Sequence, residues 1–287
     1  MTYDDVPAVE RVTAAAFYDL DVRTRPADWP TPEPRSPERA EPWLVRLAHL
    51  VEHDQPGCWV ADDDGTIVGV VAALLREGLW GLSTYAVQPG LQARGTGKAL
   101  LDAALTYGDP AGLGIICGSH DPKAVRRYRL AGFDLHPAML LWGEVRRAAL
   151  PAVHGVRAGN VGDVDMLDAI DRQVRGAGHG PDHVLMATQH RLLVLEDGAS
   201  RGYAYLYDAG VPYLLAATDA ATSTRLLWAG LAEAPTGVPV DVQHLTSRHG
   251  WAIDVGLAAG LEVHNRGYLC YRAMDPPTTY LPSGHFL

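Results

Sequence analysis

The chain has 287 residues, of which 47% are apolar and 20% charged, and its formal net charge is −10. This length and composition allow about two globular domains with buried cores. The acidic balance argues against a nucleic-acid-binding module, which would present a basic face. No uncharged apolar stretch reaches about 18 residues, and the acidic segment 1–5 lacks the features of a signal peptide.

The cysteine content agrees with an intracellular location. Three cysteines lie far apart and form no CxxC motif: Cys58, Cys117 and Cys270. Widely spaced thiols of this kind are typical of proteins in the reducing cytosol. We therefore expect a cytoplasmic protein without a membrane span, a nucleic-acid partner or a disulfide framework.

The pattern of apolar residues predicts two successive runs of the same elements. The first run has a helix over the first 20 residues and a proline-rich loop at 26–42, for which a partly helical conformation after Ser36 is the alternative. Helices at 43–53, 95–107 and 122–131 and strands at 58–62, 66–75, 79–87, 113–118 and 134–142 complete the first run. After a connector at 144–152 and a short strand at 153–157, the second run has helices at 163–174, 221–232 and 247–259 and strands at 191–196, 201–207, 212–217, 238–242 and 261–272. Helices that alternate with strands predict a mixed α/β fold.

Short sequence matches support an internal repeat. Segment 130–136, Leu-Ala-Gly-Phe-Asp-Leu-His, corresponds to segment 258–264, Ala-Ala-Gly-Leu-Glu-Val-His, at an offset of 128 residues. Asp5-Val6 before the first helix corresponds to Asp163-Val164 in the second run. Because these matches fall in the same element order, we predict two tandem domains, residues 1–145 and 152–287.

One glycine-rich segment carries the pattern of an anion-binding site. An apolar strand ends at Val87, and Gln92-Ala93-Arg94-Gly95-Thr96-Gly97-Lys98 then opens an apolar helix. Glycine lets a ligand approach the backbone closely, and the free N–H groups at a helix start favour a pyrophosphate. The segment matches neither the dinucleotide GxGxxG motif nor the Walker motif. A glycine-rich turn without a ligand is the alternative interpretation.

This segment resembles the pyrophosphate loop of the GNAT superfamily of N-acetyltransferases, which reads Gln/Arg-x-x-Gly-x-Gly/Ala. Segment 121–133, Asp-Pro-Lys-Ala-Val-Arg-Arg-Tyr-Arg-Leu-Ala-Gly-Phe, resembles the family's Asn-x-x-Ala-x-x-x-Tyr-x-x-x-Gly-Phe. The resemblance covers residues 3–143 and implies, for each copy, a mixed, mainly antiparallel central sheet flanked by helices. It also implies that the third strand of the first copy splays away from its neighbour.

The resemblance implies acetyl-CoA as cosubstrate and assigns roles to several residues. Tyr128 would be the general acid that protonates the departing CoA thiolate, since a donor there stabilises the developing charge; a packing tyrosine is the alternative. Asp121 replaces the family's Asn, which leaves its contact with the pantetheine arm open. The thioester carbonyl would bond near the N–H of Val87. The implied cofactor-binding residues are Ala86, Val87, Gln92, Ala93, Arg94, Gly95, Thr96, Gly97, Lys98 and Asp121.

The general base is not evident from the sequence. Members of the family often carry a glutamate on the third strand before Val-x-Pro, but segment 82–86 holds no carboxylate. His120 is a catalytic candidate because its unperturbed pKa suits a base, and a polar loop residue is the alternative. The other candidates are a water chain, Ser83, Tyr85 and Glu77.

The second copy has lost both motifs. Segment 217–223 aligns with the glycine-rich loop but contains no glycine and no basic residue, and Asp219 there would repel a pyrophosphate. Tyr128 corresponds to Gly256 at the offset of 128 residues. We therefore predict an intact first copy and a degenerate second copy, kept for packing or for shaping the acceptor pocket.

Two further segments have open interpretations. The tail 280–287 is either a docked segment that packs through its apolar residues or reaches the first copy's site, where His285 or the terminal carboxylate could act as a base. His179 and His183 favour a loop or a helix start, and we predict no metal site, because Gly180-Pro181 between them breaks a helix.

The leading hypothesis is an acetyl-CoA-dependent N-acetyltransferase in which the amine of a small-molecule or peptide acceptor attacks the thioester directly. A non-catalytic acyl-CoA-binding or regulatory module is the alternative that the missing base favours. An enzyme that uses another acyl-CoA or a thiol-bearing metabolite is a third, because the tandem architecture also resembles mycothiol-synthase-like enzymes, which place the active copy second. Neither the acceptor nor the oligomeric state follows from the sequence.

Overall fold

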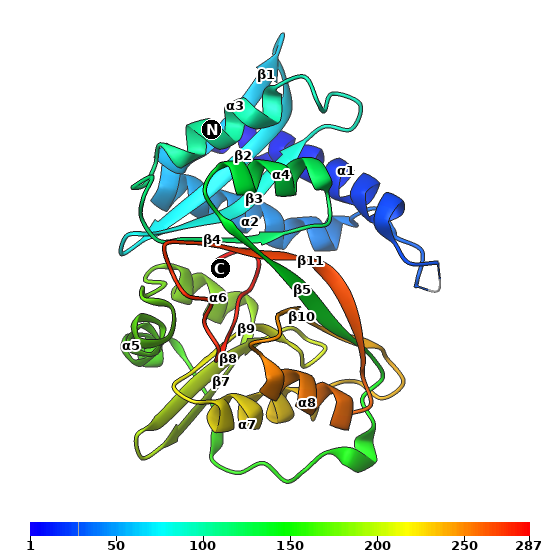
Figure 1. Cartoon of the computed structure of the whole chain (residues 1–287), viewed down its shortest axis with the longest axis vertical. Coiled ribbons are helices and arrows are strands. Elements are labelled where there is room, and N and C mark those ends of the chain that lie inside the picture. Colours follow the sequence, from blue (N-terminus) through cyan, green and yellow to red (C-terminus); the bar gives the residue numbers. More distant parts are fainter. Residues whose placement is uncertain (28) are drawn as a thin grey trace.

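The computed structural model describes residues 1–27 and 29–287, which form two β-sheets covered by helices (Figure 1). The larger sheet has seven strands in the order β1-β2-β3-β4-β11-β5-β10, and the smaller has five in the order β12-β9-β8-β7-β6. In this described part of the chain, no helix is long and apolar enough to span a bilayer. All three cysteines are free thiols.

The first half of the chain follows the predicted element order. Val6, Val9 and Val12 face inward from the first helix, and Ser36 caps the second helix with its side chain on the N–H of Arg39. The second helix begins directly after Ser36, the alternative that the sequence left open for the proline-rich loop, because proline fits its first turn. The elements are α1 (Val6–Thr24), α2 (Pro37–Asp54), β1 (Cys58–Asp63), β2 (Thr66–Arg76), β3 (Leu79–Val87), α3 (Thr96–Leu105), β4 (Gly114–Gly118), α4 (Pro122–Leu130) and β5 (Asp134–Gly143).

The second half repeats this order, which confirms the tandem α/β fold. Two of its elements were not predicted: α6 is only eight residues long and buries polar His183 and Asp182, and β12 has two residues. The elements are β6 (Val156–Ala158), α5 (Val164–Arg175), α6 (Asp182–Gln189), β7 (Arg191–Asp197), β8 (Ser200–Leu206), β9 (Pro212–Ala217), α7 (Ala220–Leu231), β10 (Val240–Leu245), α8 (Gly250–Ala258), β11 (Glu262–Arg272) and β12 (Tyr280–Leu281).

The two halves exchange strands in the larger sheet. Strand β11 of the second half lies between β4 and β5 of the first, and β5 lies between β11 and β10 (Figure 1). The sequence repeat predicts a domain boundary at 145–152, and this boundary stays a prediction. The hydrogen-bonded sheet crosses that boundary, so each half completes the other.

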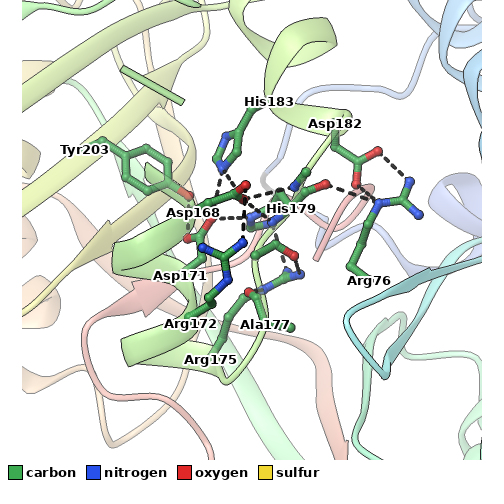
Figure 2. A network of polar contacts seen from close by, with 12 residues as sticks. Arg76, Asp168, Asp171, Arg172, Arg175, Ala177, His179, Asp182, His183 and Tyr203 are labelled. Atoms are coloured by element: carbon green, nitrogen blue, oxygen red, sulfur yellow. Dashed lines mark hydrogen bonds and ion pairs between the residues drawn. The ribbon is translucent and has the colours of Figure 1, made fainter. Parts of the chain in front are cut away.

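A buried ion network joins the halves beside the sheet. The guanidinium of Arg76 on β2 lies between the carboxylates of Asp54 on α2 and Asp182 on α6, with N–O distances of 2.8 and 2.7 Å. Figure 2 shows its contact with Asp182. His49 of α2 also contacts Asp182, at 2.7 Å. Both carboxylates are fully buried. The second half is therefore fixed against β2 and α2 of the first half.

Candidate active site

The splay expected for the third strand is present between β3 and β4. These parallel strands pair only at Trp80 with Gly114 and at Gly81 with Ile115. A bulge in the pairing of β3 with β2 leaves Ser83 between two paired positions. Bulges bend a strand and re-aim its side chains. Beyond the bulge, β3 runs on to Val87 with one edge open.

The open edge exposes the backbone groups of Val87. The N–H of Gln88 donates to Val68 O on β2 at 2.9 Å. Backbone groups alternate in direction along a strand, so the N–H and C=O of Val87 point the other way, where β4 has diverged. The side chain of Gln92 donates to Val87 O at 3.3 Å, which agrees with this direction. The Val87 N–H is therefore placed to bind a group that enters the splay.

A cavity of about 330 Å³ lies along this open edge, between β3, the loop before α3, α4 and α1. Arg94, Thr96 and His120, which the sequence motifs predicted to lie in the site, are not among its lining residues. The predicted residues that do line it are Ala86, Val87, Gln92, Ala93, Gly95, Gly97, Lys98, Asp121 and Tyr128.

The two loop glycines serve different purposes. Gly95 is the N-cap of α3 with a φ of +96°, a left-handed conformation that favours glycine. Gly97 makes room for Tyr85 instead, because a Cβ at Gly97 would lie 2.6 Å from the Tyr85 hydroxyl oxygen. That hydroxyl donates to Gly97 O at 2.7 Å. Gly97 also lines the cavity, so its role in ligand approach stays a prediction.

Basic side chains gather at the cavity although the protein is acidic overall. Lys98, Lys123, Arg127 and Arg23 line it. Asp121 also lines it, but its carboxylate accepts from the N–H of Lys123 at 2.8 Å and so caps α4. This set of cations beside the start of α3 suits a polyphosphate.

Tyr128 lies on α4 at the inner end of the cavity and is 95% buried, with its ring 6.3 Å from that of Tyr85. Burial raises the pKa of the Tyr128 hydroxyl far above its usual value. The group therefore stays protonated at neutral pH.

The structure separates most of the base candidates from the cavity. His120 is exposed, and its Nε2 accepts from the N–H of Gly267 on β11 at 2.9 Å. Glu77 forms an ion pair with Arg172 of the second half at 2.6 Å. The hydroxyl of Tyr85 is engaged with Gly97 O. Ser83 remains next to the splay, buried, with a hydroxyl that has no hydrogen-bond partner among the described residues.

The tail, for which the sequence left two interpretations open, reaches the first half. A Cβ at Gly81, where the splay starts, would lie 2.7 Å from Cδ1 of Leu287. The ring of His285 lies 5.4 Å from Trp43 of α2, and its Nδ1 lies 3.3 Å from the hydroxyl of Tyr213 on β9. Burial holds the pKa of His285 well below its usual value, so its imidazole is neutral. In the sequence, only the apolar residues of the tail indicated this contact.

A second cavity of about 280 Å³ lies between the halves. Cys117 of β4 contributes from the first half and Tyr213 from the second, and Ser283 and His285 contribute from the tail. No local pattern in the sequence indicates this cavity, because its walls come from segments that lie far apart in the chain.

The equivalent cleft of the second half is filled by the chain itself. The N–H of Ala217, at the end of β9 as Val87 is at the end of β3, donates to Thr279 O at 3.0 Å. Strand β12 pairs with β9 along the same edge. Asp219 caps α7 through the N–H of Thr222 at 2.8 Å. The position of Tyr128 is occupied by Gly256, where a Cβ would lie 2.4 Å from Leu141.

Two histidines and an aspartate meet in the buried core of the second half. His179 Nδ1 lies 2.6 Å and His183 Nε2 lies 3.0 Å from Asp171 Oδ2 (Figure 2). Tyr203 donates to Asp171 Oδ1 at 2.6 Å. Sequence reasoning missed Asp171, which α5 brings to the pair. Each of these groups already has hydrogen-bond partners, and the guanidinium of Arg175 lies 2.9 Å from His179 Nε2, so the arrangement suits a structural network better than a metal.

Comparisons with known proteins agree with this geometry. The model of the acetyltransferase (GNAT) family matches residues 14–133. A candidate acetyltransferase from Pyrococcus horikoshii is similar in structure over 98% of this chain and 92% of its own, with a TM-score of 0.72 and 15% identity. No curated protein matches in sequence.

Two further solved structures have the same fold along nearly the whole chain. A GCN5-related N-acetyltransferase from Kribbella flavida covers 94% of this chain and 69% of its own, with a TM-score of 0.57 and 16% identity. A tandem GNAT protein of the clavulanic acid biosynthesis pathway covers 96% and 98%, with a TM-score of 0.52 and 16% identity. Residues 14–133 thus form a domain of the GNAT acetyltransferase family, and the chain as a whole has the tandem GNAT fold.

Proposed function

We propose that this protein is an acetyl-CoA-dependent N-acyltransferase whose site lies in the first copy, residues 1–145, while the second copy, residues 152–287, supplies a wall of the acceptor cavity. The observation that carries this proposal is the contrast between the two copies. The N–H of Val87 faces an open splay beside a basic cavity, whereas the N–H of Ala217 is bonded to the chain's own tail.

The residues at the first cavity fit the cosubstrate. Free N–H groups at the start of α3, with Lys98 and Lys123 beside them, suit the pyrophosphate. The open edge of β3 suits an extended arm that ends at Val87. When bound, acetyl-CoA would supply the acetyl group as a thioester.

Groups of the chain itself would admit the amine, protonate the leaving sulfur and accept the proton of the amine. The second cavity, which is lined by Cys117 of β4 and by the tail, would admit the amine. Tyr128 holds its proton at neutral pH and would donate it to the sulfur that leaves. The neutral imidazole of His285, which lines this cavity, could accept a proton, and the unpartnered hydroxyl of Ser83 lies next to the splay.

The test is free-thiol release from acetyl-CoA across a library of amines, run beside calorimetric titration with CoA. Tyr128→Phe should keep the affinity for CoA and lower kcat by about ten-fold or more, because only the proton donor is lost. Tyr18→Phe, on the exposed face of α1, is the matched control. Absence of CoA binding would refute the cofactor assignment, and binding without turnover of any amine would favour the non-catalytic alternative.

A further inference from the structure

The second cavity has one carboxylate and no lysine or arginine among the described residues that line it. The carboxylate belongs to Asp241 of β10. Both histidines of the lining are neutral, because burial lowers the pKa of His244 to about 4 and that of His285 well below its usual value. A ligand in this cavity therefore meets a single negative charge. The other polar side chains of the lining are uncharged: Cys117, Tyr207, Tyr213, Gln243 and Ser283.

The half-buried carboxylate of Asp241 has no ion-pair partner in the part of the chain that the structure describes. It accepts a hydrogen bond from the side chain of Gln243. Burial raises the pKa of Asp241, and neither this hydrogen bond nor the charge of Arg266 on β11 offsets the rise. The guanidinium of Arg266 forms its ion pair with Asp21 of α1 instead, at 3.4 Å. A carboxylate that is partly removed from water is normally paired, so Asp241 has room for a cation.

Two tyrosine rings line the same cavity as this carboxylate. Tyr207 follows β8 and Tyr213 lies on β9, with ring centres 5.2 Å apart. Burial raises the pKa of the Tyr207 hydroxyl, and the nearby charge of Asp241 raises it further, to about 12. Arg46 of α2 acts on both rings through its charge, but it is outside the lining, and its guanidinium lies 3.9 Å from the ring centre of Trp43. Aromatic rings attract ammonium groups, so the tyrosines and the carboxylate suit the same ligand group.

The position of the cavity relates it to the acceptor. Strand β4 pairs with β3 only as far as Ile115, and Cys117, two residues further along, lines the cavity. A Cβ at Gly118 would lie 3.0 Å from the ring of Tyr128. Neighbouring residues of a strand project to opposite faces. The second cavity and the proposed proton donor therefore lie on opposite faces of β4, where this strand borders the splay.

We propose that Asp241 binds an ammonium group of the acceptor, so that the acceptor is a small molecule with two or more amino groups, a diamine or a polyamine. This inference rests on the proposed function. A cavity of about 280 Å³ suits a short carbon chain. The net charge of −10 attracts cations to the protein. Anionic amines such as amino acids are disfavoured, because Asp241 repels a carboxylate.

The two amines have different parts in the reaction. The first, in its neutral form, forms a bond to the acetyl carbon and gives up one proton, which the imidazole of His285 could take. The carbon–sulfur bond breaks, and the sulfur leaves as the thiol of CoA with the proton of Tyr128. The second amine stays protonated on Asp241. Loss of Asp241 should therefore change the choice of acceptor and leave the reaction of a monoamine unchanged.

The test compares matched amines on the full-length protein with acetyl-CoA. Each diamine from 1,3-diaminopropane to 1,6-diaminohexane is paired with the monoamine of the same chain length, with rates corrected for the neutral fraction of each amine. At least one diamine should exceed its monoamine by about ten-fold or more in kcat/KM. The acid 4-aminobutyrate should be a poorer acceptor than butylamine. Equal use of diamines and monoamines would overturn the inference.

Variants show whether this preference depends on the carboxylate. Asp241→Asn keeps the shape of the side chain and should abolish the preference while the affinity for CoA is kept, and Asp241→Glu should retain part of it. Tyr207→Leu should lower it by about three-fold. Asp208→Asn is the matched control, because Asp208 is next to Tyr207 but exposed and outside the lining. A preference that survives in Asp241→Asn, or one that Asp208→Asn abolishes equally, would contradict the proposal.

Calorimetry with the same compounds separates this inference from the proposed function. If CoA binds but no amine is turned over, the proposed function fails, and the ammonium site is then decided by binding alone. Binding of a diamine that disappears in Asp241→Asn supports the site. Absence of any binding that depends on Asp241 overturns it.

Discussion

Replacement of Arg76 by glutamine should destabilise the protein strongly. Arg76 donates to both oxygens of Asp54, each at 2.8 Å, and to both oxygens of Asp182, at 2.7 and 2.8 Å. Both carboxylates have no exposed surface. Removal of one partner from a buried ion pair typically costs about 3–5 kcal/mol. Asp182 keeps His49, and Asp54 keeps the hydroxyl of Tyr107, so we expect a cost within this range.

The cost should also depend on pH. Burial alone would raise the pKa of Asp182, but hydrogen bonds from His49 and Arg76 hold this pKa below its usual value. A carboxylate with a lowered pKa contributes stability above its unfolded pKa, and this contribution is lost as pH falls through the folded value. In Arg76→Gln that lowering weakens and burial favours the protonated form. The difference between the two proteins should therefore shrink as pH falls from 7 towards about 4.

Denaturant unfolding of the wild type and the variant at pH 7 and near pH 4 measures both effects. Arg172→Gln is the matched control, because Arg172 also joins the halves through an ion pair with Glu77, at 2.6 Å, but both side chains are about half exposed. Exposed pairs contribute at most about 1 kcal/mol. Equal losses in the two variants, or a loss in Arg76→Gln that does not change with pH, would contradict this reasoning.

The site and its surroundings support three more predictions. Gly97→Ala should weaken CoA binding by about ten-fold, because its Cβ would meet the Tyr85 hydroxyl; calorimetry should show recovery when Tyr85→Phe is added, and no recovery would place the clash elsewhere. CoA should bind once per chain, since β12 fills the second cleft; a calorimetric stoichiometry of two would contradict this. Stability should fall as pH drops from about 6.5 towards 4, because the unfolded state alone takes up protons there; denaturation at several pH values checks this, and a flat profile would refute it. The pKa of one histidine, His183, is raised, but burial lowers the pKa of four others to about 4, and these four outweigh it: His179, His190, His244 and His249.

The sequence by itself determined the element order and the loop of the first site. Turn residues, apolar periodicity and helix-start chemistry act over a few neighbouring residues, so local patterns alone assign Val87, Gly95 and Tyr128 to one site. The absence of these motifs near Asp219 is also visible in the local sequence alone. These features needed no knowledge of which strands pair.

The tertiary structure decided which strands pair and what the second half does for the first. The exchange of β11 and β5 and the pairing of β12 with β9 join segments far apart in the chain, and such pairing leaves no local pattern. Along the sequence, Arg46 reads as one more charge on an amphipathic helix. It becomes a buried cation only in the folded chain, where segments far away in the sequence, such as the tail at His285, pack against α2.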